Sequence, residues 1–489
     1  MAVATWVGGD GTGSEQTDYG RTANWSGGVV PNADDHVIVA NTGHNCKLDA
    51  NREAASLTVN SGATLDGSGA KLSIKSEGDS SEGTNGYAVN IDGIIAGNLD
   101  LEINTPAATN IDLKPSPATH FVRNVTINHA SCAAAIADGF MTISGNLTIT
   151  TGSLNTGGND LTVAGNTRIG PASGGPDQAT LTCNASTISL GSDKTDDYGL
   201  TVVKGGTFVG GTGTHTIGAI AMADFDDAKC TLTSGVTTMN GEDSGDNYAI
   251  NIGGSSTFAH GSGTVTITRA SDTRIRNSGA DLALNNLIIN HASAVITLAS
   301  NGLTCAGDLT ITAGEFGTGA DKALTVTGDV TIAAAGTLTC NSSTVSVDSF
   351  TISSGGTLSA PDASGSLTLN GTKNAWSFQN NSTNFSHNNG TITQTNAGHI
   401  KSVSSNPMYN FIMNSSSSDS HEAVFRPSSG TDCVIAANEV TVTRGIVKLN
   451  TVSNNASMGS LTIGSTGTFQ ASSGTTTITG ESGAGNAIL

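Results

Sequence analysis

A block of short alternating segments returns along this chain of 489 residues. The block Asn128–Ser131 recurs 162 positions later as Asn290–Ser293, and a second shared block follows each copy, starting at Gly145 and at Gly307. A weaker third copy spans Met408–Asn414. Long repeats built from short alternating strands indicate a solenoid, in which each repeat can bury its apolar face only against its neighbours.

Strand signals fill the sequence between these blocks. Each is three to five residues long, with aliphatic side chains on one face and hydroxyl-bearing side chains on the other. Examples are Ser56–Val59, Lys71–Ile74, Leu161–Val163, Thr264–Ile267, Leu324–Val326, Ser366–Leu369 and Ser460–Ile463. Turns rich in Gly, Asn, Asp and Ser separate them, such as Asn60–Gly62 and Asp66–Gly69.

Strands this short, with corners this frequent, predict an all-β fold without helices of useful length. We expect a right-handed parallel β-helix of the pectin-lyase-like kind, with coils of about 20–25 residues and a small N-terminal cap. A β-sandwich array is the alternative architecture, and it would have longer loops and more aromatic strands.

The repeats also predict how the chain is divided. The segment Gly86–Ile91 matches Asn247–Ile252, which places two tyrosines 161 positions apart. We expect modules at roughly 77–240, 241–370 and 371–489, the last one incomplete, within a solenoid over 51–489. Residues 1–50 differ from the modules and contain two of the three tryptophans, Trp6 and Trp25, so we expect a cap or attachment unit there. Any specific recognition of a partner is expected where the copies differ, in the turns around Asp193–Gly211 and Asn380–Ser405.

Charge and composition narrow the choice of partners. The net charge is −20, and charged residues make up 12% of the chain. An acidic surface disfavours nucleic acid and anionic membranes as partners, because both require positive charge. No stretch approaches the length of a membrane span, so no membrane insertion is expected.

The cysteines point to folding in a reducing compartment. There are seven, an odd number, dozens of residues apart and without any C-x-x-C spacing. We expect free thiols that pack as small hydrophobic side chains. No signal peptide is visible at Met1–Val7, which also favours folding in a cytoplasm.

Carboxylates crowd several turns, and paired carboxylates are what glycoside hydrolysis requires. The weak candidates are Asp224, Asp226 and Asp227, followed by Asp196 and Asp197 and by Glu242, Asp243 and Asp246. All of them lie in Gly- or Ser-rich turns with few aromatic residues nearby, which indicates solvated turns rather than catalysis. We therefore expect no catalytic residue. The segment Gly8–Gly11 is similar to a calcium-binding repeat but occurs once, and His129 and His291 fit repeated corner positions, so no metal or cofactor is expected.

The N-terminal unit carries a family resemblance. Its pattern W-x-G-G, T-A-x-N-W-S-x-G-x-V-P and D-D-x-V-x-I, set by Trp6, Trp25, Pro31 and Asp35, resembles the opening of large β-helical proteins. These include bacterial surface adhesins and structural proteins of tailed bacteriophages. Because a secreted adhesin would normally have a signal sequence, the resemblance favours the phage side: a tail fibre, tailspike or capsid-attached fibre.

The leading hypothesis is therefore a virion structural protein, assembled in the host cytoplasm and extracellular after lysis, that attaches to a host or surface. The expected partners are other virion proteins, further copies of the chain with a trimer favoured, and host surface glycans. The alternatives are a polysaccharide depolymerase on a β-helical scaffold and a cell-surface adhesin.

Overall fold

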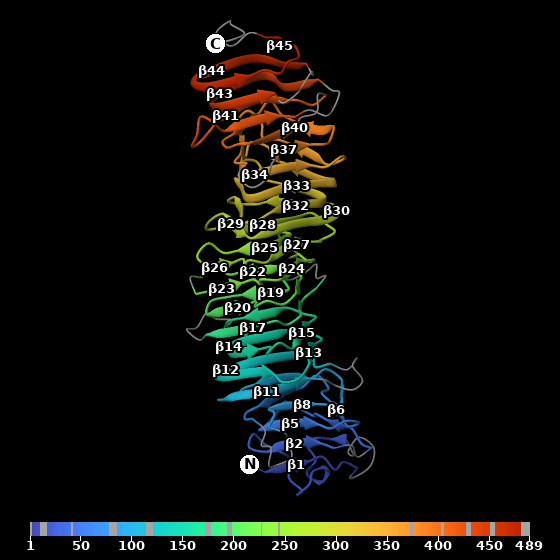
Figure 1. Cartoon of the computed structure of the whole chain (residues 1–489). Coiled ribbons are helices and arrows are strands. Elements are labelled where there is room, and N and C mark those ends of the chain that lie inside the picture. The colour runs from blue at the N-terminus through green and yellow to red at the C-terminus, as the bar shows by residue number, and fades with distance from the viewer. Residues whose placement is uncertain are drawn as a thin grey trace. The chain divides into compact units, whose positions relative to one another are not determined.

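The structure, a computed structural model, is all-β and solenoid-like. It describes residues 2–9, 17–40, 43–77, 86–113, 121–171, 178–192, 198–225, 227–242, 245–371, 376–401, 405–426, 432–449 and 455–480. The chain forms two compact units, Met1–Gly263 and Thr264–Leu489. Strands follow one another through each unit (Figure 1), and a single 3₁₀ turn, η2, spans Thr22–Asn24.

In its described residues, the first unit has three long parallel ladders and one short one. One contains β1 (Val3–Thr5), β2 (His36–Val39), β5 (Ser56–Val59), β8 (Val89–Ile91), β11 (Ala108–Leu113), β12 (Asn124–Ile136), β14 (Leu147–Asn155), β17 (Ala179–Thr182), β20 (Gly206–Val209), β23 (Lys229–Thr231) and β26 (Thr257–Ala259). The short ladder is a separate three-stranded sheet of β3 (Cys46–Lys47), β6 (Thr64–Asp66) and β9 (Ile94–Ala96). The second long ladder contains β13 (Phe140–Ile143), β15 (Asp160–Val163), β18 (Ile188–Leu190), β21 (His215–Ile217) and β24 (Val236–Met239). The third contains β4 (Arg52–Ala54), β7 (Lys71–Ile74), β10 (Asp100–Ile103), β12, β14, β16 (Thr167–Ile169), β19 (Leu200–Val202), β22 (Ile220–Met222) and β25 (Tyr248–Ile252).

The second unit is built in the same way. One ladder runs through β29 (Leu282–Leu284), β31 (Leu303–Cys305), β33 (Leu324–Thr339), β34 (Thr344–Ile352), β36 (Ser366–Leu369), β39 (Thr391–Gln394), β41 (Met408–Asn414), β43 (Cys433–Leu449) and β44 (Ala456–Gln470). Another runs through β27 (Thr264–Ile267), β30 (Asn286–Leu298), β32 (Leu309–Gly317), β33, β34, β37 (Trp376–Asn380), β40 (Gly398–Lys401), β42 (Glu422–Phe425), β43 and β44. A third contains β28 (Thr273–Asn277), β30, β32, β33, β35 (Thr357–Ser359) and β38 (Asn384–Ser386), and the ends of β43 and β44 continue to β45 (Thr476–Ile478).

Parallel pairing aligns equivalent side chains into columns. In the first unit, Val37, Leu57, Val89, Ile111 and Ile136 are register partners and are all buried. In the second, a column is formed by Leu309, Val330, Phe350, Phe378, Ile400, Phe425 and Leu449. Each aliphatic side chain buried in this way contributes about 1.5–3 kcal/mol of hydrophobic free energy. The alternation seen in the sequence therefore builds the interior of both units.

The parallel pairing of the described strand pairs is that of a solenoid and not of an antiparallel sandwich. The predicted segments Ser56–Val59, Lys71–Ile74 and Ser366–Leu369 are strands with those bounds. Strand length was predicted less well, since β33 has 16 residues and β43 has 17. These strands continue through a corner and serve more than one ladder, so local alternation alone underestimates them.

The repeated block forms a repeated corner. Register shifts follow Ile127 in β12 and Ile289 in β30, at the first residue of each copy. Beyond the shift, the backbone N–H of Ser131 donates to Nδ1 of His129 at 3.2 Å, and that of Ser293 donates to Nδ1 of His291 at 3.3 Å. Each imidazole thus closes its own bend.

Asn and Asp side chains form ladders that connect successive coils. In each step the backbone N–H of one ladder residue donates to the side-chain oxygen of the ladder residue in the previous coil, at 2.8–2.9 Å. One ladder contains Asn124, Asn146 and Asn166, and the other Asn286, Asp308 and Asp329.

The tyrosine repeat does not return to the same ladder. Within the first unit, β8 carries the first copy and pairs with β5 and β11. The second copy is β25, which pairs with β22 in a different ladder. The sequence period of 161 residues between Tyr87 and Tyr248 is therefore not a whole number of coils.

The seven cysteines are free and buried, as predicted. They occupy interior positions of the coils, and burial raises the pKa of Cys230, Cys305, Cys340 and Cys433 to about 12. Thiols held this far from ionisation are poor nucleophiles, which agrees with a packing role.

Candidate functional site

The N-terminal unit is organised around an aromatic cluster. Trp6 and Trp25 lie 5.1 Å apart between ring centroids in an edge-to-face arrangement, and Tyr19 packs on Trp25 at 4.7 Å. All three side chains are buried. The indole N–H of Trp25 donates to the carbonyl of Tyr19 at 2.7 Å, and that of Trp6 donates to the carbonyl of His44 at 3.0 Å. Both indole donors are therefore satisfied inside the molecule.

This cluster holds two segments against the free edges of the first coil. The backbone of Ser26 donates to the carbonyl of Thr5 in β1 at 2.9 Å, and Thr5 donates back to Oγ of Ser26 at 2.9 Å. The backbone of Tyr19 donates to the carbonyl of Lys47 in β3 at 2.9 Å. Unpaired strand edges template aggregation, so segments that occupy them act as a cap.

Pro31 and Asp35 lie in the loop between the aromatic cluster and β2. Pro31 is buried, and Asp35 is half-buried, with its carboxylate accepting the backbone N–H of Asn32 at 3.1 Å. The neighbouring Val29 is 63% exposed. A partner that docks on this unit would meet the loop around Val29 and not the indole rings. Tyr19 was missed in the sequence, because a single tyrosine in a Gly- and Asp-containing turn gives no periodic signal.

In the acidic corner of the first unit, the structure describes Asp224 and Asp227, which lie in different surroundings. Asp224 is exposed, and it accepts hydrogen bonds from the backbone N–H and the hydroxyl of Ser255 at 2.6 and 2.8 Å. These bonds, the backbone one first, lower its pKa. Asp224 therefore ties two coils together, while Asp227 is half-buried and its Oδ1 has no partner among the described residues. The candidates Asp226, Asp196, Asp197 and Asp243 lie outside the described residues, as does Asp10 of the glycine-rich segment.

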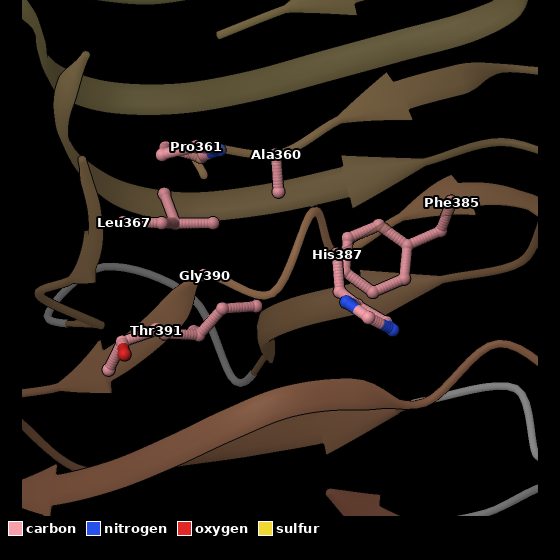
Figure 2. Close-up of a pocket in the computed structure, with 8 residues that line it drawn as sticks. Ala360, Pro361, Leu367, Phe385, His387, Gly390 and Thr391 are labelled. Atoms are coloured by element: carbon pink, nitrogen blue, oxygen red, sulfur yellow. The ribbon is translucent and has the colours of Figure 1, made fainter. Parts of the chain in front are cut away.

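A narrow crevice opens in the second unit, and part of its lining comes from the segment Asn380–Ser405, where specific recognition was expected. Figure 2 shows Pro361, Leu367 and Phe385 around it, together with the imidazole of His387. It encloses about 180 Å³ of empty space including its mouth, yet it admits no water-sized sphere. His387 stacks on Tyr409 with ring centroids 5.1 Å apart, and its Nδ1 accepts the backbone N–H of Asn389 at 2.9 Å. The crevice offers a flat aromatic contact and no nucleophile.

One carboxylate that the sequence did not single out is held more tightly than these. Glu102 on β10 is 9% exposed and accepts hydrogen bonds from Lys71 Nζ at 2.7 Å, Ser73 Oγ at 2.7 Å and Asn128 Nδ2 at 2.9 Å. Burial raises its pKa, but the hydrogen bonds from Lys71, Asn128 and Ser73 outweigh burial and lower the pKa to about 2. Asn128, the first residue of the repeated block, therefore serves to anchor this side chain.

We expect the first unit to lose this stabilisation in acid. Because the pKa of Glu102 is lower in the folded state than in the unfolded chain, its contribution is complete above the unfolded value of about 4.3 and is lost as the pH falls towards about 2. Glu102→Gln should cost about 1–2 kcal/mol at pH 7, and the difference from the parent chain should shrink through this window.

The matched control is Glu53→Gln, which removes the more exposed pair with Lys75, 3.1 Å between Oε1 and Nζ. It should change the free energy of unfolding by less than about 0.5 kcal/mol. Denaturant titrations between pH 2 and pH 7, followed by hydrogen exchange at β7 and β10, measure both. Equal pH profiles for the two variants would contradict the role assigned to Glu102.

Comparisons of the chain with protein-family models, with curated proteins and with solved structures found no match. Within the described residues, no helix is long and apolar enough to cross a membrane.

Proposed function

We propose that the chain is a virion structural protein: a right-handed parallel β-helix that projects from a particle and attaches to a host or surface. The observation that carries this proposal is the kind of residue found at the repeated positions. The positions that recur between its copies hold buried aliphatic residues and corner-closing residues such as His129 and His291, whose side chains bond to their own turns. A repeat of this kind sets the length of a structural element.

The N-terminal cap supports the same proposal. Segments held by Trp6 and Trp25 occupy edges that would otherwise pair with other chains. Growth of the solenoid is thereby restricted, and the loop around Val29 is left for a partner in the particle. The partners we propose are other virion proteins and two further copies of the chain, packed side by side as a trimer.

Electron microscopy of purified particles labelled with an antibody against this chain tests the proposal. Labelled projections on the particle are expected, and their site distinguishes a head from a tail location. If the antibody labelled intact uninfected cells and no particles, the virion proposal would be refuted in favour of a cell-surface adhesin.

One observation favours the alternative of a polysaccharide depolymerase. Phe225 is 43% exposed between Asp224 and the remaining acidic residues of the corner, and an exposed aromatic ring beside carboxylates suits a sugar. Incubation with a panel of capsular polysaccharides, followed by assay of reducing ends, tests it. Release by the parent chain that is lost in Asp226→Asn would establish the activity, and an intact panel would refute it.

A further inference from the structure

A row of outward-facing side chains follows one ladder of the second unit. Register pairs connect Trp376 on β37 to His399 on β40, His399 to the buried Val424 on β42, and Val424 to Lys448 on β43. Trp376, His399 and Lys448 are partly exposed, and the first two contact each other edge to face with ring centroids 5.6 Å apart. Phe378, Ile400 and Phe425 fill the interior, and a register shift between Trp376 and Phe378 allows Trp376 to lie outside.

Two cations, Lys401 and Arg426, extend this row, and neither has an acidic partner in the part of the chain that the structure describes. Lys401 follows Ile400 on β40, and Arg426 follows Phe425 on the paired strand, where its N–H donates to the carbonyl of Ile400 at 2.8 Å. Lys401 Nζ donates to the amide oxygen of Asn381 at 2.6 Å, and the Arg426 side chain is exposed. Among the described residues, neither has a carboxylate within ion-pair distance.

The remaining charges of the row are a lysine and one acid. Lys448 Nζ lies 3.3 Å from both carboxylate oxygens of Glu422. Burial lowers the pKa of His399, Arg426 lowers it further, and Glu422 raises it, so both of these side chains face the imidazole. Four strands carry this arrangement, which at about 4.8 Å per strand spacing spans roughly 14 Å.

Such a surface is unusual for this chain. It has 40 acidic residues against 20 basic ones, yet three cations gather here around a single carboxylate. Adjacent like charges on paired strands destabilise a sheet, so this cluster is a cost to the fold. An anion that binds between the cations would offset it.

We propose that this row, formed by Trp376, His399, Lys401, Arg426 and Lys448, binds an acidic polysaccharide. A sugar ring stacks on the indole of Trp376, while carboxylate or sulfate groups of the chain bind Lys401 and the planar fork of Arg426. The length of the row suits several sugar units. This inference rests on the proposed attachment function and adds the chemical class of the surface that is bound.

Binding of the purified full chain to immobilised polygalacturonate, dextran sulfate and neutral dextran tests the row. At least one of the two acidic polymers should bind, and neutral dextran should not. Binding should weaken as the salt concentration rises from about 0.05 to 0.5 M. The double variant Lys401→Ala/Arg426→Ala should lose about tenfold or more in affinity, and Trp376→Ala should lose about fivefold. Lys401→Arg/Arg426→Lys, which keeps both charges, should retain most of the binding.

The matched control is Lys229→Ala/Arg274→Ala, which removes two exposed cations from β23 and β28 and alters the net charge equally. It should stay within about twofold of the parent chain. The inference would be overturned if both double variants lost affinity equally or if Lys401→Ala/Arg426→Ala kept the affinity of the parent chain. It would also be overturned if light scattering showed salt-sensitive self-association of the chain in place of polymer binding. Labelling of particles tests the attachment function separately. Polysaccharide binding by the row and the attachment function can therefore be refuted independently of each other.

Discussion

Replacing Gly152 by alanine should destabilise the first unit by about 3 kcal/mol. Gly152 has φ +85°, and a Cβ there would lie 2.5 Å from the carbonyl oxygen of His129 and 2.7 Å from that of Cys132. Both contacts are with backbone atoms of the neighbouring coil, which cannot rotate away. The substitution therefore adds a clash between coils to the cost of a left-handed conformation.

The same effect is expected at the equivalent position of the second unit. Gly314 has φ +86°, and its Cβ would lie 2.2 Å from the carbonyl oxygen of His291. Gly158→Ala is the control, because Gly158 has φ +96° and nothing within 4 Å of the added atom. That variant should lose only about 1 kcal/mol, the cost of the conformation itself.

Hydrogen exchange at β12 and β14 measures the expected loss locally, since a solenoid can unfold in parts and one melting temperature averages over them. Protection in these strands should fall in Gly152→Ala while β29 and β31 stay protected. If Gly152→Ala and Gly158→Ala proved equally stable, close approach of the coils would not be the reason for glycine at the repeated corner.

Removing the indole of Trp25 should uncover the first coil. Trp25→Ala deletes a buried ring that packs on Trp6 and Tyr19, which costs about 3–5 kcal/mol. With the cluster gone, the segments that pair with Thr5 and Lys47 lose their support, and the edges of β1 and β3 become free to bind other chains. Loss of stability and gain of aggregation are both expected.

Light scattering during size-exclusion chromatography, with hydrogen exchange at β1 and β2, checks this expectation. Trp25→Phe should give an intermediate result, because the ring is kept while the indole donor is lost. Trp376→Ala supplies the matched control, since that indole is partly exposed on an outer face and its removal should leave the chain monodisperse. A monodisperse Trp25→Ala chain with protected β1 would refute the cap.

Alternation in the sequence predicted the all-β, solenoid-like architecture, for a physical reason. Side chains such as Leu161 and Val163 are buried by the period of a single strand, so their environment is encoded within a few residues. The residue required at a corner, in contrast, depends on contacts with the neighbouring coil. Gly152 is required by a carbonyl 23 positions earlier, and no local pattern reveals that contact.

The candidate site was less predictable. Trp6 and Trp25 stand out by composition, and they do meet in space. Glu102 resembles any outward-facing acid in its strand, and its three donors come from two other coils, Lys71 and Ser73 from β7 and Asn128 from β12. The row from Trp376 to Lys448 is also assembled from four strands, so sequence spacing gives no sign that these side chains are neighbours.

The change of ladder between β8 and β25 has a bearing on what the first unit can present to its surroundings. A duplicated segment that returned to the same ladder would repeat its outer side chains in one direction, as a stripe. Here the second copy faces another side of the unit, because the period does not match the coil. Duplication of the sequence has thus distributed related surfaces around the circumference, and a flat target can engage one copy at a time.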